Sequence, residues 1–146
     1  MYRQLAVRTL TKGSALGKNA VRVPQQMRMA SALVSSFESS VNALPGREAV
    51  RYTDHNIKWT AGEFKGYADA HANALLEHGF HSGDTIAVWL PEGAEKHITL
   101  LAAAKMGLKV VNIDISVESV QDLRAVLSQA NAKALFFEPI TATSDN

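Results

Sequence analysis

The side chains of this sequence best suited to acid–base chemistry or metal binding are its five histidines, His55, His71, His78, His81 and His97. No pair of them shares a predicted helix at the three- or four-residue spacing with a carboxylate partner that a metal site would need. His78 and His81 straddle the end of a predicted helix, where we interpret His78 as a cation near the helix C-terminus. We interpret His71 and His97 as residues at the edge of the core, each with a satisfied ring nitrogen.

Two carboxylates, Asp84 and Asp114, are the best candidates for a ligand site. Asp114 ends a predicted strand, and ligands of parallel sheets gather at the carboxyl ends of strands. Asp84 follows Gly83 in a tight turn, however, and Asp is common in turns, so we favour a turn or cap role for both. No Ser lies in G-x-S-x-G, and the chain contains no Cys. The sequence therefore assigns no catalytic, cofactor-binding or metal-binding residue.

A phosphate-binding turn is also missing where a nucleotide fold would place it. The apolar strand that ends at Leu90 continues as Pro91-Glu92-Gly93-Ala94, without G-x-G-x-x-G or G-x-x-x-x-G-K-[ST]. The backbone amides at the start of the next helix could face an anion. Glu92 and Glu95 already stand there and complement the helix dipole, so we favour a helix-cap role over a phosphate site.

These residues are positioned by alternating strands and helices in the second half of the chain. The predicted elements are a strand at 85–90, a helix at 94–106 that is apolar on nearly every side, a strand at 109–113, a helix capped by Ser116 or Ser119, and a strand at 132–137. Asn131 is predicted as the left-handed stop of the last helix. Because such crossovers are right-handed, the order predicts an α/β fold with a parallel βαβαβ sheet flanked by helices.

An N-terminal helix and a short β-hairpin precede this unit. Apolar residues at Leu33, Val34, Phe37, Val41 and Leu44 predict an amphipathic helix over 31–44, and Val120, Leu123, Leu127 and Ala130 predict the buried stripe of the last helix. The segments 48–53 and 57–59 predict a hairpin that turns at Asp54-His55-Asn56. Thr60 and Glu63 form a capping box at the start of a helix that Gly79 closes.

The first thirty residues differ in charge from the rest. Residues 1–37 hold six of the 15 basic residues and no acid, which leaves nine basic residues against 14 acidic ones and a formal charge of −5 from residue 38 onward. We interpret 1–30 as a mitochondrial transit peptide, cleaved near 28–31 and directing the chain to the matrix, and 31–146 as one domain. The alternative is a disordered basic arm that binds nucleic acid or anionic membrane. The acidic body disfavours nucleic acid, and no apolar stretch is long enough for a transmembrane helix.

Three motifs in order resemble the AMP-forming adenylating enzymes, the superfamily of acyl-CoA synthetases and AMP-dependent ligases. Residues 57–64 (IKWTAGEF) resemble the first core motif of that family, and residues 79–91 (GFHSGDTIAVWLP) resemble its Gly-x-x-x-Gly-Asp-x-Val segment. Residues 103–114 (AAKMGLKVVNID) resemble its second core motif. One departure is local, since Glu92-Gly93 stands where the family usually has Asn. The resemblance covers the stretch from Leu44 to Phe137.

The resemblance implies a partial N-terminal domain of an adenylate-forming enzyme. Relatives activate a carboxylate with MgATP to acyl-AMP and then transfer the acyl group to coenzyme A. ATP, Mg and coenzyme A are therefore implied for full-length relatives, and none is expected to bind these 146 residues alone. Two readings stay open: the N-terminal part of a mitochondrial acyl-CoA synthetase-like ligase, or a truncated, non-catalytic relative that serves as a structural or interaction subunit. The expected partner is the remainder of the ligase domain or another protein subunit.

Overall fold

Three parallel strands form the centre of the structure, a computed structural model that describes residues 6–9, 25–53 and 56–138. They are β4 (Thr85–Trp89), β5 (Lys109–Asn112) and β6 (Ala134–Phe137). β4 lies in the middle and pairs in parallel with both neighbours, in register Ile86↔Val110 and Ile86↔Ala134. A fourth strand, β1 (Ala6–Thr9), pairs antiparallel with β6, so the order is β1-β6-β4-β5. The predicted α/β fold with a parallel βαβαβ sheet is confirmed.

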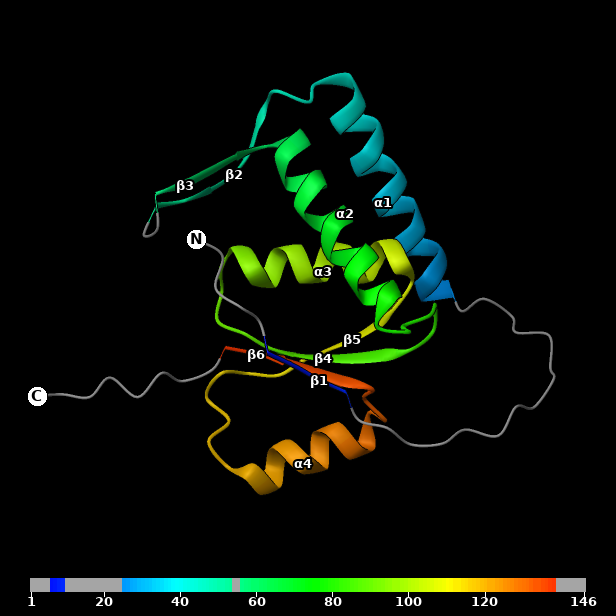
Figure 1. Cartoon of the computed structure of the whole chain (residues 1–146), viewed down its shortest axis with the longest axis vertical. Helices are drawn as coiled ribbons and strands as arrows, with labels where there is room; N and C mark the ends of the chain where they lie inside the picture. Colours follow the sequence, from blue (N-terminus) through cyan, green and yellow to red (C-terminus); the bar gives the residue numbers. More distant parts are fainter. Residues whose placement is uncertain (1–5, 10–24, 54–55, 139–146) are drawn as a thin grey trace, which may run out of the picture.

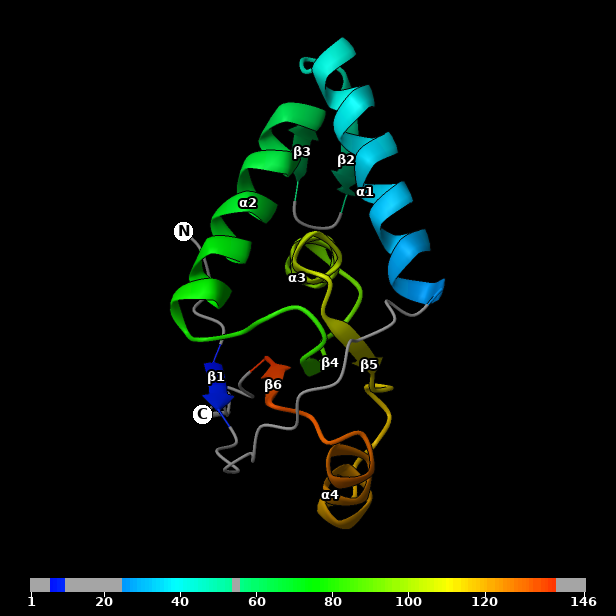
Figure 2. The ribbon, with the colours of Figure 1, turned by 90° about the vertical axis from the view of Figure 1, so that its right-hand side faces the viewer.

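Helices cover both faces of this sheet (Figure 1). Helices α1 (Gln25–Ala43), α2 (Ala61–Glu77) and α3 (Ala94–Met106) lie on one face, and α4 (Val120–Gln129) lies on the other. Seen end-on in Figure 2, α3 is enclosed by α1, α2 and the sheet. This explains why α3 is apolar on nearly every side, since only Glu95 and His97 in it are exposed. The neighbouring helices and the sheet therefore cover the apolar sides of α3.

The core lies mainly between the sheet and the three helices. Its largest fully buried side chains include Phe80, Ile86, Val88 and Phe136. A smaller cluster under α4 contains only Ala87, Ile113 and Ala132 as buried residues. Because hydrophobic stabilisation grows with the apolar area removed from water, the α1–α3 side holds most of the stabilising burial.

The starts and stops of the helices follow the sequence signals. The Thr60 side chain accepts the Glu63 amide at 3.2 Å, and the Glu63 carboxylate accepts the Thr60 amide at 2.8 Å, so the capping box is confirmed. Gly107 ends α3 in the left-handed region with φ 68°, and Asn131 does the same after α4 with φ 49°. Of the two caps proposed for α4, Ser119 is the one used.

The hairpin and the helix stripes are confirmed only in part. β2 (Glu48–Tyr52) and β3 (Ile57–Thr60) form the antiparallel hairpin, whose Asp54 and His55 lie outside the described residues. α1 begins at Gln25 rather than near Ser31. The buried stripes are wrong at Leu33, Leu44 and Val120, which are 73%, 56% and 61% exposed. Leu44 follows the end of α1 and Val120 begins α4, whereas Leu33 lies in the middle of α1 on a side that faces solvent.

The N-terminal residues bear on two further predictions. Most of the predicted leader, residues 1–5 and 10–24, lies outside the described residues. Its boundary near residue 30 therefore stays a prediction. Within the part of the chain that the structure describes, no helix combines the length and hydrophobicity needed to cross a bilayer.

Candidate functional site

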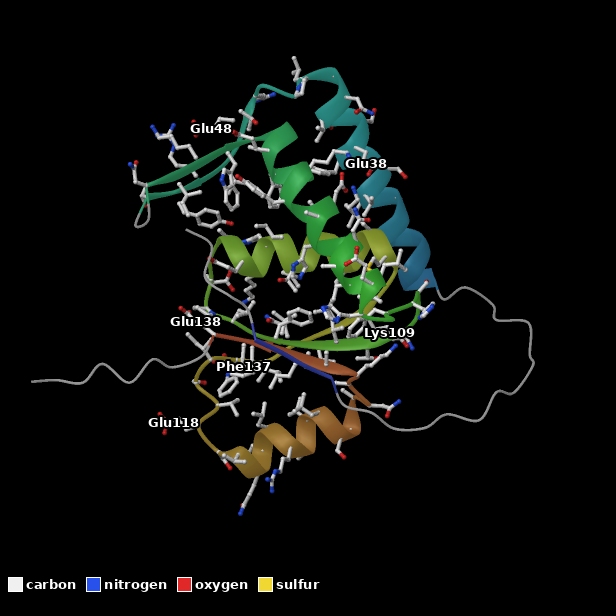
Figure 3. All side chains as sticks on the ribbon, in the orientation of Figure 1. Glu38, Glu48, Lys109, Glu118, Phe137 and Glu138 are labelled. Atoms are coloured by element: carbon white, nitrogen blue, oxygen red, sulfur yellow. The ribbon has the colours of Figure 1, made fainter. Side chains whose placement is uncertain are left out.

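The carboxyl ends of the three parallel strands meet at one edge of the sheet, which we call the carboxyl edge. Glu92 follows β4, Asp114 follows β5 and Glu138 follows β6. Figure 3 shows Phe137 and Glu138 at the end of the sheet opposite Lys109, which begins β5. Open parallel sheets bind their ligands at this edge, so the carboxyl edge is the place in the fold to examine for chemistry.

Glu92 is held by a lysine of the helix that follows it. Lys96, in α3, is only 7% exposed, and its ammonium group forms an ion pair with the exposed carboxylate of Glu92. The hydrogen bond from Lys96 holds the pKa of Glu92 below its ordinary value. The amino end of α3 therefore carries a cation that the chain itself neutralises. Sequence reasoning missed Lys96, although its four-residue spacing from Glu92 was the available signal.

Asp114 serves as a turn residue, as the sequence predicted. Its Oδ1 accepts the backbone amide of Ser116 at 2.8 Å, and its carbonyl accepts the indole N–H of Trp89 at 3.0 Å. The hydrogen bond from the Ser116 amide lowers the pKa of Asp114, with a smaller contribution from the charge of Lys96. The carboxylate therefore orders the loop between β5 and α4.

His97 joins the hairpin to α3. Its Nδ1 lies 2.8 Å from the Tyr52 hydroxyl and 2.7 Å from the carbonyl of Gly93. Burial raises the pKa of Tyr52, and the nearby carboxylates of Glu95 and Glu92 raise it further, so the phenol stays protonated and able to donate. An unprotonated Nδ1 accepts from Tyr52 and fixes the hairpin, whereas an Nδ1–H donates to Gly93 and holds the loop before α3, so the tautomer decides which contact forms. The predicted satisfied ring nitrogen of His97 is confirmed, but the side chain is 46% exposed, so its predicted place at the edge of the core is wrong.

His71 differs from this expectation. Its Nε2 is buried without a hydrogen-bond partner, so the predicted satisfied nitrogen is wrong for that atom. The ring stands 5.7 Å from the ring of Phe136, and burial lowers the pKa of His71. The residue sits on α2 facing the sheet, where the surrounding surface is apolar and offers no acceptor. Helical spacing predicted the burial but gave no information on the orphaned nitrogen.

Asp84 lies at the opposite, amino end of the sheet. It accepts the His81 amide at 2.8 Å and the Lys133 ammonium at 2.7 Å, while Lys133 also donates to the carbonyl of Gly79 at 2.6 Å. Burial alone would raise the pKa of Asp84, but these two hydrogen bonds outweigh it and the pKa is lowered. The predicted turn role is confirmed, and Lys133 is a partner that the sequence did not reveal.

These residues do not fit a MgATP site. At the carboxyl edge three carboxylates, Glu92, Asp114 and Glu138, stand against Lys96, so a triphosphate would meet a net negative surface. Among the described residues no group of three His, Cys, Asp or Glu side chains could hold a metal ion. The polar contacts position loops, helices and the hairpin, and we derive no catalytic step from them.

Comparison with protein families matches residues 37–146 to the family model described as AMP-binding enzyme. YngI of Bacillus subtilis, provisionally named an acyl-CoA synthetase, is 32% identical over 99 residues, which cover 68% of this chain and 18% of YngI. Human medium-chain acyl-CoA ligase ACSF2, mitochondrial, is 28% identical over 101 residues, which cover 69% of this chain and 16% of ACSF2. The chain therefore spans less than a fifth of the length of the curated relatives it matches.

Solved structures agree on the fold. The N-terminal domain of FACL13 from Mycobacterium tuberculosis matches with a TM-score of 0.69 at 20% identity, over 77% of this chain and 31% of that one. The N-terminal subdomain of Klebsiella oxytoca NpsA in complex with 3-hydroxyanthranilyl-AMSN matches with a TM-score of 0.67 at 25% identity, over 75% of this chain and 28% of that one. The fold in Figures 1 and 2 thus matches part of a larger domain in these proteins.

Proposed function

Because the chain belongs to the family of AMP-binding enzymes and corresponds to a partial N-terminal domain of an acyl-CoA synthetase-like enzyme, we propose that it contributes scaffold to such a ligase. The observation that carries this proposal is the family match over 37–146, on a fold in which Asp84, Glu92 and Asp114 are engaged in structural contacts. In this role the three parallel strands and α3 supply a rigid layer, and the reactive groups come from other parts of the ligase.

The reaction of the whole ligase would have two steps. A carboxylate attacks the α-phosphorus of MgATP, which forms acyl-AMP and releases pyrophosphate. The thiol of coenzyme A then attacks the acyl carbonyl, which forms the acyl-CoA thioester and releases AMP. Catalysis of this kind depends on positioning phosphates and neutralising their charge. The acidic carboxyl edge supplies neither, so we expect no adenylation by this chain alone.

Exchange of labelled pyrophosphate into ATP tests this directly. The purified chain is assayed with MgATP, pyrophosphate and a panel of carboxylates, with full-length YngI assayed beside it as a ligase of the family. We expect exchange at the level of the blank for this chain. Carboxylate-dependent exchange that survives further purification would overturn the proposal, because it would place the reactive machinery within these residues.

A non-catalytic structural subunit is the second candidate. The sheet face under α4 favours it, because that side has few buried residues and leaves Ile115 and Val120 61% exposed each. A partner that covered these two side chains would remove their apolar surface from water. Immunoblotting of the native protein separates the candidates: a band at the size of the curated relatives supports the ligase, whereas a band at the size of this chain supports the subunit.

We also propose mitochondrial import through residues 1–30. The support is the basic, acid-free composition of this arm and the mitochondrial name of the ACSF2 relatives. A fluorescent protein fused to residues 1–40 should enter the matrix. The matched control carries glutamine at the six basic positions Arg3, Arg8, Lys12, Lys18, Arg22 and Arg28, and should stay outside. A wild-type fusion that stays in the cytosol would contradict import.

A further inference from the structure

The two edges of the four-stranded sheet differ in how they are protected. β5, at one edge, begins with exposed Lys109 and ends with exposed Asn112, and a lysine on an edge strand discourages pairing with other chains. β6 reads Ala134-Leu135-Phe136-Phe137 and carries no charge. It is covered instead by β1, a four-residue strand more than a hundred residues away in the sequence (Figure 1). Protection of β6 therefore depends on a short segment of the N-terminal arm.

The direction of the β6 amides can be worked out from one hydrogen bond. The amide of Lys133 donates to the Thr85 carbonyl of β4 at 2.7 Å. Since successive amides of a strand point to opposite sides, the amides of Leu135 and Phe137 also face β4. Those of Ala134 and Phe136 then face outward, to β1. Ala134 stands opposite Thr9, and Phe136 stands opposite Val7. In an antiparallel ladder, two directly opposite residues form either both of the backbone hydrogen bonds between them or none. Val7 and Thr9 therefore direct their own amides at β6.

We propose that the outer edge of β6 is a strand-accepting surface, that β1 keeps it closed within one chain, and that displacing β1 pairs two copies of the chain through β6. Exposed amides and carbonyls on an edge are a template for any extended segment. β6 meets its own copy without charge repulsion. In a two-fold antiparallel pairing centred on Leu135, Ala134 of each copy faces Phe136 of the other, so all four outward amides find acceptors.

This inference goes beyond the proposed function, since it concerns pairing between copies of the chain and not the ligase reaction. It also means that removal of the N-terminal arm would change how the chain associates. Cleavage near residues 28–31, as proposed for import, would remove β1 and open the edge. Closure by β1 would then keep the uncleaved chain monomeric.

Proline substitutions in the full chain test the inference within a single strand. Val7→Pro with Thr9→Pro removes the two amides directed at β6, whereas Ala6→Pro with Arg8→Pro puts the same number of prolines at positions whose amides point away. Hydrogen exchange at low protein concentration should show the Phe136 amide exchanging about tenfold faster or more in the first variant, with Leu135 unchanged as the internal control. The second variant should exchange like wild type.

Sedimentation over a range of concentrations tests the pairing. The Val7→Pro/Thr9→Pro variant should form dimers as its concentration rises, with protection of Phe136 returning in step, while the wild type and the Ala6→Pro/Arg8→Pro variant stay monomeric. A synthetic peptide of residues 3–12 added in excess should return the dimer to monomer. If the double variant does not fold, Val7→Pro alone is used in the same way.

Two results would overturn the inference. Equal exchange of Phe136 in the two proline variants would mean that β1 does not close the edge. A variant with a fast Phe136 amide that stays monomeric at every concentration would mean that the open edge does not accept a second copy, even if it captures the added peptide.

Discussion

Replacement of Lys105 by Met should loosen the three helices on the main face of the sheet. The Lys105 side chain, at the end of α3, is 14% exposed and reaches carboxylates on two other helices. Its Nζ lies 2.7 Å from Glu38 of α1 and also pairs with Asp69 of α2. Met keeps an unbranched apolar side chain of nearly the same length and removes the ammonium group with its charge and hydrogen bonds. The change therefore isolates the ion pairs from the packing.

The expected loss in the free energy of unfolding follows from how exposed the two carboxylates that pair with Lys105 are. Removing one member of a fully buried pair costs about 3–5 kcal/mol, whereas an exposed pair contributes about 0–1 kcal/mol. Glu38 and Asp69 are 39% and 34% exposed, so water can hydrate their carboxylates, and Asp69 keeps Lys65 at 2.6 Å. We expect a loss of about 1–2 kcal/mol, which lowers the Tm of a domain of this size by about 5–10 °C.

Urea and thermal unfolding followed by circular dichroism measure this loss. The matched control is Lys65→Met, which removes a 30% exposed lysine that pairs with Asp69 within α2 alone. It should cost less than about 0.5 kcal/mol. Equal effects of the two substitutions, or a Lys105→Met protein as stable as wild type, would refute the reasoning that Lys105 joins the helices electrostatically.

Three further outcomes follow from single residues. Burial lowers the pKa of His71, so as pH falls the unfolded state binds a proton before the folded state does. The free energy of unfolding should therefore decrease as pH drops below the ordinary histidine pKa of about 6.5. His71→Leu should make the urea midpoint depend less on pH between pH 7.5 and 5. Gly107→Ala should lower the free energy of unfolding in urea by about 1–2 kcal/mol, because φ is 68° and the new Cβ would lie 2.7 Å from the Ser82 hydroxyl. The control Gly66→Ala, in open space within α2, should raise it by about 0.5–1 kcal/mol. Thr60→Ala should remove the capping box and lower the Tm through a loss of about 1 kcal/mol.

Local signals were sufficient to predict most of the architecture. The capping box at Thr60 and the left-handed positions at Gly107 and Asn131 are determined by a few neighbouring residues, so they can be recognised in sequence. The right-handed crossover rule then gave the parallel sheet. Asp84 and Asp114 were correctly placed in turns for the same reason, whereas the cap role predicted for Glu92 is wrong, since no side chain caps the start of α3 and Glu92 pairs with Lys96.

The contacts that the sequence did not reveal are long-range. β1 pairs with β6 across most of the chain, and a four-residue segment, Ala-Val-Arg-Thr, in a basic arm carries no signal of its partner. Lys105 reaches carboxylates on two other helices for reasons visible only in the assembled layers. Val120 and Leu33 have correct helical spacing, yet no element of the described residues covers them. Periodicity predicts which face of a helix is apolar but not how far its neighbours extend.

Titration of the chain with MgATP, followed by the backbone amide signals in NMR spectra, is the most direct test of the claim that these residues supply scaffold without a nucleotide site. The acidic carboxyl edge predicts no saturable shift at the amides of Glu92 to Lys96 or of Asp114 to Ser116 up to millimolar nucleotide. A saturable set of shifts confined to that edge would contradict the account, because it would show ATP bound by these residues alone.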